Sequence, residues 1–147
     1  MKISTKGRYG LRALVDLAYH SENDHVALKS IAERQGISEN YLEQVFSALR
    51  KAGVVKSVKG AQGGYSLGLP AKDLTVGKIL KVLEGSLTVM DDSENSQSPK
   101  DIQGILVRMV WSQMDEAIEK VVEHITMEDL VGQYRLQTGS GSEMYFI

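Results

Sequence analysis

The residues best suited to chemistry lie between positions 36 and 65, and the chemistry they suggest is hydrogen bonding rather than catalysis. Polar side chains recur at helical spacing and are followed by a basic, glycine-rich stretch. Carboxamide, carboxylate and hydroxyl groups can bond to base edges, and lysines can bond to phosphates. The predicted DNA-contacting residues of this stretch are Ser38, Asn40, Tyr41, Glu43, Gln44, Lys56, Lys59, Gly60, Gln62, Gly63 and Tyr65.

Two short helices joined by a tight turn would present these groups. Gly36 suits the position that ends a first helix, which we expect over residues 28–35. Ser38 suits the N-cap of the second helix, and Gly53 would end it. The opposite, apolar side of the second helix predicts packing in the core. It comprises Tyr41, Leu42, Val45, Phe46 and Leu49.

A β-hairpin is predicted next, with Val54 and Val58 on one side and Lys56 on the other. Its turn, residues 59–64, holds three glycines that allow a sharp reversal and a close approach to a partner. This turn lacks the Lys-Ser/Thr pair of a P-loop and no helix follows it, which excludes nucleotide binding. Together, the helix pair and the hairpin predict a winged helix-turn-helix that binds a double-stranded DNA operator.

The N-terminus supplies a second basic group. A helix is predicted over residues 5–20, with hydroxyl and basic residues at its start. Free N–H groups beside cations favour phosphate binding. The alternative is a loose basic tail, which the close spacing of Lys6, Arg8 and Arg12 disfavours. The residues added to the predicted DNA-binding set are Lys2, Ser4, Thr5, Lys6 and Arg8.

Composition excludes several classes of protein. The 147-residue chain has no cysteine, which excludes disulfides, thiol switches and cysteine-ligated metal centres. Its three histidines lie in separate segments, so we predict no metal site and no cofactor. No apolar run approaches the ~20 residues of a membrane span, and no signal peptide is recognisable, so we expect a cytoplasmic protein. No nucleophile–base pair stands at a suitable spacing, and we expect no enzyme activity.

The net charge of −2 conceals an asymmetry between the two parts of the chain. Residues 1–65 hold ten lysines and arginines against six acidic residues, and the remainder holds seven against thirteen. An acidic protein can still bind DNA when its positive charge gathers on one face. The alternative is an ordinary solvated surface.

A long helix is predicted over residues 101–125, and ~24 residues would make it ~36 Å long. A short helix should follow from Thr126, with Asp129 in place of the usual glutamate of a capping box. An apolar seam of this length predicts a homodimer, because helix-turn-helix proteins read two half-sites through a two-fold dimer. The alternative is packing on its own domain. The predicted dimerisation residues are Ile105, Leu106, Met109, Val110, Met114, Ile118, Val121, Val122 and Ile125.

We expect a mainly α fold with a small β-hairpin: a winged helix-turn-helix domain plus a long dimerisation helix. The predicted divisions are the winged domain (1–85), a loop (86–100), the long and short helices (101–136) and a tail (137–147). The tail joins a Gly-Ser spacer to an apolar peptide that needs cover in water. It is predicted to bind a partner, with packing on its own dimer as the alternative. The partner-binding residues are Met144, Tyr145, Phe146 and Ile147.

Three stretches resemble one family of transcription regulators. They are M-K-I-S-T-K-G-R-Y-G at the start, I-S-E-N-Y-L-E-Q in the second helix of the pair and V-K-S-V-K-G-A-Q-G-G-Y in the hairpin. They resemble the winged helix-turn-helix regulators that include IscR, NsrR and CymR, and the likeness covers essentially the whole chain. It implies a winged domain followed by a long dimerisation helix. Members that sense iron–sulfur status or nitric oxide carry three cysteines in the loop before that helix. This chain has none there, so cluster sensing is not implied.

The resemblance is strongest to the branch of the cysteine-metabolism repressor CymR. The shared features are the start, V-L-E-G at 82–85, T-x-E-D-L at 126–130 and an apolar tail ending in isoleucine. This likeness implies a repressor of cysteine and sulfur-metabolism genes that acts with cysteine synthase, with residues 144–147 as the docking peptide. The Gly-Ser spacer departs from the expected pattern. Two alternatives stay open: a module that binds an enzyme through its tail, or a regulator of the same family with a different regulon.

Overall fold

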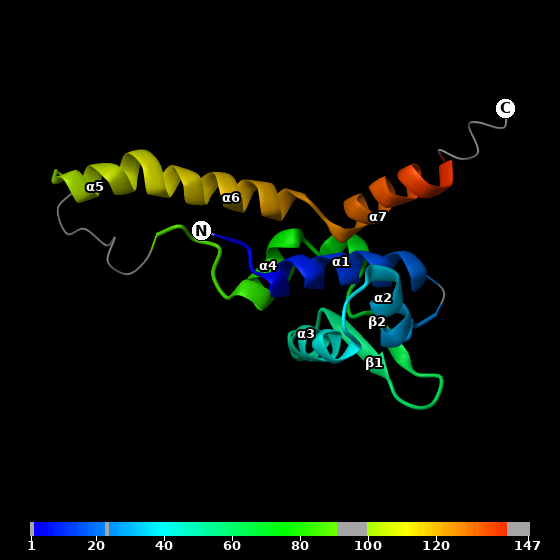
Figure 1. Cartoon of the computed structure of the whole chain (residues 1–147). Helices are drawn as coiled ribbons and strands as arrows, with labels where there is room; N and C mark the ends of the chain where they lie inside the picture. Colours follow the sequence, from blue (N-terminus) through cyan, green and yellow to red (C-terminus); the bar gives the residue numbers. More distant parts are fainter. Residues whose placement is uncertain (1, 23, 91–99, 141–147) are drawn as a thin grey trace.

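A computed structural model describes residues 2–22, 24–90 and 100–140 (Figure 1). The predicted fold class, a mainly α winged helix-turn-helix with a small hairpin and a long helix, is confirmed. The elements in chain order are α1 (Thr5–His20), α2 (Leu28–Gln35), α3 (Glu39–Lys51), β1 (Val55–Val58), β2 (Gly64–Leu67), a 3-10 turn (Ala71–Asp73), α4 (Val76–Glu84), α5 (Ile102–Leu106), a π-helical turn (Val107–Trp111), α6 (Ser112–His124), α7 (Met127–Arg135) and a second π-helical turn (Leu136–Ser140).

The turn between α2 and α3 forms as its sequence predicts. Gly36 adopts a left-handed conformation with φ of 65°, which a residue without Cβ reaches at little cost. Its amide donates to the carbonyl of Ala32 and so ends α2. The Ser38 hydroxyl then accepts a hydrogen bond from the Tyr41 amide at 3.2 Å and caps α3. These local bonds set the angle between the two helices.

The core lies where α1 crosses α2 and α3. The apolar side of α3 is buried as predicted, and only Tyr41 of the five residues is partly exposed. Burying a leucine or phenylalanine side chain contributes ~1.5–3 kcal/mol, so this side holds the exposed polar side in place. The largest fully buried side chains include Phe46, Leu14, Leu17, Ile31, Leu42 and Leu49.

A buried ion pair also fixes α2 against α1. Asp16 of α1 is only 4% exposed. It accepts hydrogen bonds from Arg34 Nη2 at 2.7 Å and from Gln35 Nε2 at 2.9 Å. The bond to Asp16 raises the pKa of the Arg34 guanidinium, so Arg34 stays charged. Since a buried carboxylate needs such partners, the pair favours a single placement of α2.

The wing is an antiparallel hairpin of β1 and β2, paired from Val55–Leu67 to Val58–Gly64. The predicted alternation along its first strand is wrong. Val54 and Val55 are both buried, whereas Val58 is 46% exposed. The reason is that the strand begins only at Val55, and Val54 belongs to the preceding turn that packs into the core.

A backbone bridge ties the wing to the loop before α2. The amide and carbonyl of Val26 bond to the carbonyl and amide of Tyr65, each at 2.8 Å. Gly64 is required beside this bridge, because a Cβ there would collide with the Val26 carbonyl. The bridge therefore sets where the wing stands relative to the helix-turn-helix.

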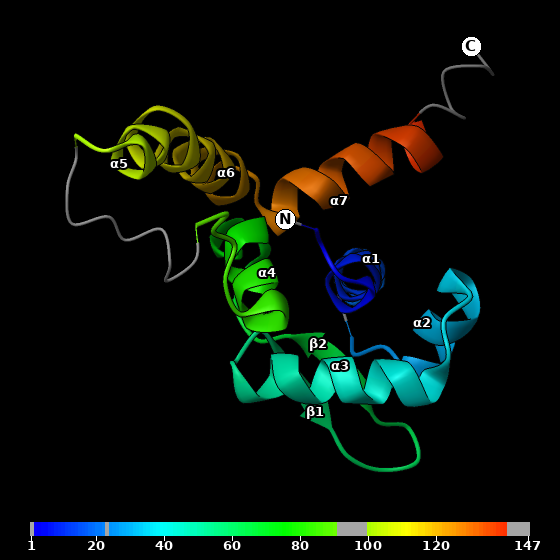
Figure 2. The same cartoon turned by 60° about the vertical axis from the view of Figure 1, so that its left-hand side comes forward.

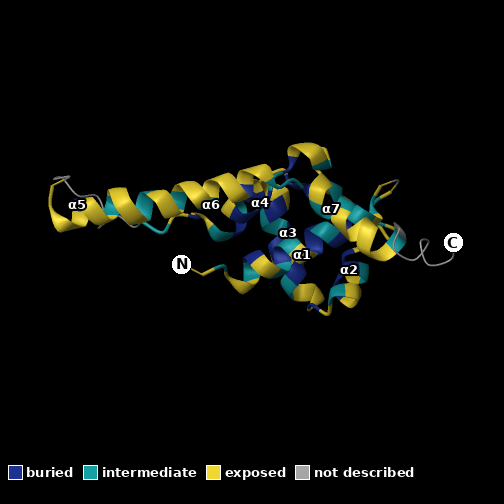
Figure 3. Ribbon diagram, turned by 90° about the horizontal axis from the view of Figure 1, so that it is seen from above, coloured by how far each residue is buried: buried dark blue, intermediate teal, exposed yellow. Residues whose placement is uncertain are grey.

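The long helix is interrupted by the π-helical turn, where a regular helix over 101–125 was expected. Its apolar residues often recur four apart, and such a series drifts around a helix of 3.6 residues per turn. A π turn contains more residues per turn and takes up part of that drift. Figure 3 shows that α5 and much of α6 project from the domain and are largely exposed.

One end of α6 is attached to the winged domain. Val122 packs in a small cluster with Val76, Leu80 and Leu87, and Ile118 and Ile125 lie against that cluster. Lys81 of α4 pairs with Glu119 at 2.9 Å and Glu123 at 3.3 Å. Three of the predicted dimerisation residues, Ile118, Val122 and Ile125, therefore already contact the winged domain of their own chain. The six that are left exposed are Ile105, Leu106, Met109, Val110, Met114 and Val121.

The turn into α7 is fixed by backbone bonds and by a capping box. The Val76 amide donates to the Ile125 carbonyl at 2.9 Å, and the Met127 amide donates to the Leu74 carbonyl at 2.8 Å. The predicted capping box is confirmed, since the side chains of Thr126 and Asp129 each accept from the other's amide. α7 then packs against α1 (Figure 1).

Candidate DNA-binding surface

A groove lies between α3 and the wing on the side of the domain away from α6 and α7 (Figure 2). One wall is the exposed side of α3, and the other is the β1–β2 hairpin with its tip. The start of α2 closes one end. Its charged and polar lining residues include Lys29, Glu39, Glu43, Ser47, Arg50 and Lys59.

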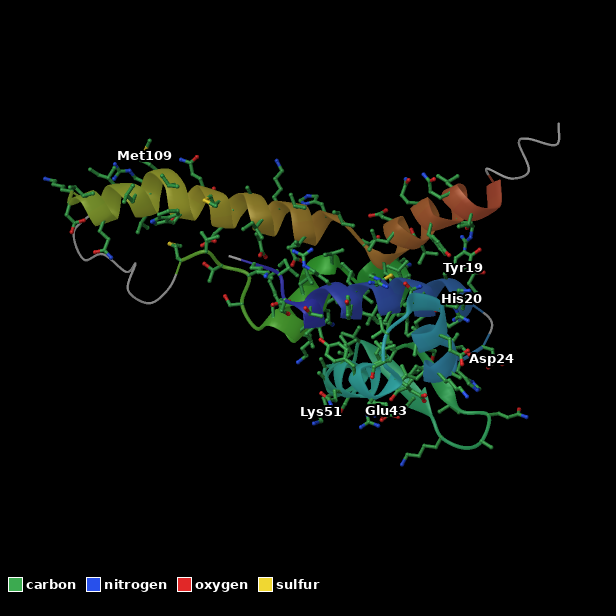
Figure 4. The ribbon with its side chains drawn as sticks, viewed as in Figure 1. Tyr19, His20, Asp24, Glu43, Lys51 and Met109 are labelled. Atoms are coloured by element: carbon green, nitrogen blue, oxygen red, sulfur yellow. The ribbon has the colours of Figure 1, made fainter. Side chains whose placement is uncertain are left out.

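The exposed side of α3 is polar along its length. Asn40, Glu43, Gln44 and Ser47 line an open depression on this side. Glu43 also lines the groove toward the wing, so it stands between the two surfaces. Figure 4 shows Glu43 and Lys51 at the lower edge of α3, away from the core. A helix that presents donors and acceptors in this way can enter a major groove.

Exposed cations lie on α2, on the last turn of α3 and on the wing. Lys29, Arg50, Lys51, Lys56 and Lys59 are all exposed. Within the described residues, none of these five forms an ion pair with a carboxylate. Their charges are therefore available to phosphates, whose neutralisation supplies much of the affinity of DNA-binding proteins.

The wing tip is held by its own turn and by a neighbouring loop. Gly60 has φ of 114°, which favours glycine, and its carbonyl accepts from the Gly63 amide at 3.0 Å. The Gln62 carbonyl is contacted by the ring of His25. At the base of the wing, the Tyr65 ring packs edge-on against Phe46 with centroids 5.0 Å apart.

Two predicted DNA contacts on α3 also have roles within the chain. The Ser38 hydroxyl caps the helix, and the Tyr41 ring meets Tyr9 of α1 edge-on at 6.1 Å. Arg12 lies over the other ring of this pair, 5.1 Å from the Tyr9 centroid. The start of α3 is thereby fixed against α1.

The N-terminal group lies apart from the groove, beside α4, in both Figure 1 and Figure 2. Ser4 bonds to Glu84, and Arg8 Nε donates to the Ile3 carbonyl at 3.0 Å. Lys2 and Thr5 are exposed, and Lys6 is half-buried.

Of the predicted residues, the groove brings together Glu43 of α3 and four wing residues, Lys59, Gly60, Gly63 and Tyr65. Asn40 and Gln44 line the neighbouring depression on α3, whereas Lys56 lines a separate depression beside His25, and the five N-terminal residues lie apart. The phosphate-binding role of that group stays a prediction.

Several residues of the groove were not predicted from the sequence, among them Lys29, Glu39, Ser47 and Arg50. Glu39, Ser47 and Arg50 share a side of α3 with Glu43, at steps of three and four residues. That spacing is a signal that could have identified them. Lys29 gave no such signal, because only the tertiary packing of α2 brings it to the groove.

Two parts of the prediction lie outside the described residues. They are the tail peptide, residues 144–147, and most of the predicted loop, residues 91–99. Among the residues that are described, no helix is long and apolar enough to cross a membrane.

Comparison with known proteins identifies the family. A family model, Rrf2, described as an iron-dependent transcriptional regulator, matches residues 3–133. The chain belongs to the Rrf2 family. The transcriptional regulator CymR of Bacillus subtilis is 43% identical over 130 residues, which are 88% of this chain and 89% of that protein. IscR of Photobacterium profundum is 39% identical over 97% of this chain and 83% of its own length.

Solved structures of Rrf2 regulators agree with this assignment. CymR, the global cysteine regulator of B. subtilis, has a TM-score of 0.78 at 41% identity, covering 90% of this chain and 98% of that one. IscR of T. potens has a TM-score of 0.76 at 44% identity, covering 99% and 96%. The two kinds of regulator are about equally similar to this chain.

Iron is named in the family description, which raises the question of a cluster site in this chain. Cysteine thiolates are the usual ligands of iron–sulfur clusters, and this chain has no cysteine. Among the described residues, no three histidine, aspartate or glutamate side chains gather as a metal-binding group. The residues present therefore do not fit a cysteine-ligated cluster.

Proposed function

We propose that this Rrf2 regulator is a sequence-specific repressor that binds an operator as a homodimer. The observation that carries this proposal is the groove in which the polar side of α3 faces Lys59 of the wing, with Lys29 and Arg50 in the same lining. None of these three cations forms an ion pair within the described residues. In this groove, Lys29, Arg50 and Lys59 would bind phosphates. Because the family regulates transcription, binding at an operator that overlaps a promoter would repress the gene.

In this proposal, residues at the centre of α3 contact the bases. Gln44 can bond to adenine through its carboxamide, and Glu43 can accept from the amino group of cytosine. Two carboxylates, Glu39 and Glu43, lie among the groove cations and would repel phosphates. Acidic groups here therefore favour discrimination between bases over affinity for DNA in general.

A homodimer is supported by the exposed apolar residues of the long helix. Met109 of the π-helical turn is 56% exposed, and Val121 of α6 is 57% exposed although its neighbour Val122 is buried. A second copy of the chain would cover such residues and would place two recognition helices on one duplex.

We further propose that the regulated genes belong to cysteine and sulfur metabolism. The similarity to CymR supports this regulon, and so does the lack of cysteine ligands for a cluster. IscR-like proteins are as similar, so a different regulon within the family is the competing proposal. In the cysteine proposal, cysteine synthase would modulate DNA binding by docking at residues 144–147.

Selection of genomic DNA by the purified protein tests both parts of this proposal. We expect enrichment of promoters of sulfur-assimilation and cysteine genes, and a changed occupancy when cysteine synthase and O-acetylserine are added. Enrichment of iron–sulfur assembly promoters instead would refute the proposed regulon but retain DNA binding. Enrichment of no sequence at all would refute the operator-binding function.

Deletion of residues 144–147 tests the proposed partner site. The truncated chain should lose binding to cysteine synthase and keep its affinity for DNA. If the full chain binds the enzyme but no DNA, it is an interaction module rather than a regulator that also binds an enzyme. If deletion leaves enzyme binding intact, residues 144–147 are not the docking site.

A further inference from the structure

Arg12 of α1 contacts the chain on both sides of the turn between α2 and α3. Its Nη2 atom donates to the carbonyl oxygen of Gln35 at 2.5 Å, and Gln35 is the last residue of α2. Its guanidinium also lies over the Tyr9 ring, 5.1 Å from the centroid, within the ~6 Å range of a cation–π contact. The Tyr9 ring meets that of Tyr41, in the first turn of α3, edge-on at 6.1 Å. One side chain therefore links α1 to the end of α2 and, through Tyr9, to the start of α3.

The bond to Gln35 stabilises the end of a short helix. The last carbonyls of a helix have no partner within it, and a cation is favourable there because this end of the helix dipole is negative. Gly36 follows directly and redirects the chain with φ of 65°. Arg12 and Gly36 therefore act on the same turn, which sets the angle between α2 and α3.

We propose that Arg12 is a positioning residue that sets the orientation of α3 for reading bases and does not contact DNA itself. This inference rests on the proposed function and deepens it. Arg12 lines a pocket between α1 and α7, beside Leu11 and Tyr134. In the part of the chain that the structure describes, other residues line the DNA-binding groove. A binding site tolerates errors of only about 0.5 Å and 10–20° in the placement of its side chains, so a small rotation of α3 would alter the base contacts of Glu43 and Gln44.

Arg12 differs from Asp16, which lies one turn further along α1 and also holds the end of α2. Asp16 is only 4% exposed and accepts hydrogen bonds from Arg34 and from the Gln35 side chain, so its loss would leave buried donors unpaired. Arg12 is exposed, and the apolar side of α3 stays in the core without it. Replacement of Arg12 should therefore change the orientation of α3 without unfolding the domain.

A direct contact between Arg12 and a phosphate is the competing role, because basic residues cluster near the start of α1. The two roles predict different results in a DNA titration. Loss of a phosphate contact weakens binding to every duplex alike and reduces the salt slope by about one. Loss of positioning lowers discrimination between sequences and leaves the salt slope unchanged.

The orientation of α3 is tested by residual dipolar couplings of the full chain without DNA. In Arg12→Gln, the amide couplings of α3 should no longer fit the wild-type orientation relative to α1, whereas those of α4 should still fit. Arg12→Lys keeps a cation and a donor but lacks the planar guanidinium, so its couplings should fall between those of Arg12→Gln and the wild type.

Arg8→Gln is the matched control for these couplings. Arg8 lies one turn earlier on α1, and its Nε atom donates to the Ile3 carbonyl rather than to the helix pair. Its replacement should leave the α3 couplings unchanged. Core methyl signals establish that each variant is folded. Wild-type α3 couplings in Arg12→Gln would overturn the proposal.

The reading of bases is tested by anisotropy titrations at several salt concentrations, with a duplex recovered by genomic selection and a shuffled duplex. Arg12→Gln should lower the ratio of the two affinities by about fivefold or more, the effect of losing one base contact, and keep the wild-type salt slope. Equal weakening on both duplexes with a slope reduced by about one would overturn the proposal in favour of a phosphate contact.

Two further outcomes separate this inference from the proposed function. A reoriented α3 with unchanged discrimination would overturn the role of Arg12 in reading bases. If the wild type does not discriminate between the duplexes, the proposed function fails and the reading role fails with it, whereas the couplings still decide whether Arg12 orients α3.

Discussion

Ser4 and Glu84 are joined by two hydrogen bonds across 80 residues of sequence. The Ser4 amide and the Ser4 hydroxyl both donate to Oε1 of Glu84, at 3.0 and 2.6 Å. The same hydroxyl accepts from the Gly7 amide at 3.2 Å and so caps α1. A Cβ at Gly7 would meet the end of the Glu84 side chain, so a larger residue here would displace the carboxylate from this contact. The start of α1 is thereby fixed to the end of α4.

Ser4→Ala should lower the free energy of unfolding by about 1 kcal/mol, because it removes both a helix cap and a bond to a carboxylate. Urea denaturation followed by circular dichroism measures this change. Thr5→Ala is the matched control, since the neighbouring hydroxyl is exposed and should contribute little. Equal stability of Ser4→Ala and the wild type would show that the contact with Glu84 makes no net contribution to the free energy of unfolding.

Local signals predicted most of the winged domain. Gly36, Ser38 and Thr126 act through bonds to residues three or four positions away, and such patterns are visible in a sequence. The polar side of α3 could be predicted for the same reason, since a buried stripe implies an opposite exposed face.

Long-range contacts could not be predicted in this way. The Ser4–Glu84 bonds and the place of Lys29 in the groove depend on tertiary packing. The spacing of the apolar residues also predicted a single continuous apolar seam along the long helix. Val122 satisfies that pattern but is buried against α4, because one end of the helix packs on its own domain. The π turn likewise leaves no clear signature in residue types.

Gly64→Ala should displace the wing and destabilise the protein. A Cβ at this position would meet the Val26 carbonyl, which is backbone and cannot swing aside as a side chain would. Gly132→Ala on α7 is the control, because a Cβ there meets nothing within 4 Å, and alanine in a helix is worth up to about 1 kcal/mol of added stability. Thermal unfolding should therefore show opposite shifts in melting temperature. A neutral Gly64→Ala would mean that the Val26–Tyr65 bridge is dispensable.

Asp115 of α6 holds the segment that follows α4. Its carboxylate accepts from the Thr88 hydroxyl at 2.5 Å and from the Val89 amide at 2.6 Å. Burial acts to raise the pKa of Asp115, but the hydrogen bonds from Thr88 and from the Val89 and Met90 amides outweigh it and leave this pKa below its ordinary value. Stability from this group is therefore present above the ordinary value of about 3.9 and is lost as pH falls through the lower folded value.

Asp115→Asn should accordingly destabilise the protein at neutral pH, and the difference from wild type should shrink as pH falls below about 4. Urea denaturation at a series of pH values measures this convergence. Glu116→Gln, a neighbouring exposed position on α6, should show no such difference. A destabilisation that is the same at every pH would rule out the carboxylate as its source.

Met109→Glu should weaken the proposed homodimer, because it puts a charge among the exposed apolar residues of the long helix. Sedimentation velocity over a range of concentrations measures the monomer–dimer equilibrium. Gln113→Glu introduces the same charge at an exposed polar position of α6 and is the control. If the wild type sediments as a monomer at all concentrations, the homodimer is refuted. An unchanged monomer–dimer equilibrium in Met109→Glu would show that the dimer interface does not include Met109.

The most direct test of DNA reading by α3 and the wing is a salt-dependent anisotropy titration of Glu43→Ala and Lys59→Ala. The probes are a duplex recovered by genomic selection and a shuffled duplex of the same composition. Glu43→Ala should lose about 1–3 kcal/mol of discrimination between the two duplexes. Lys59→Ala should weaken binding to both duplexes alike and reduce the salt slope by about one. Unchanged affinity, discrimination and salt slope in both variants would contradict the assignment of this groove as the DNA-binding surface.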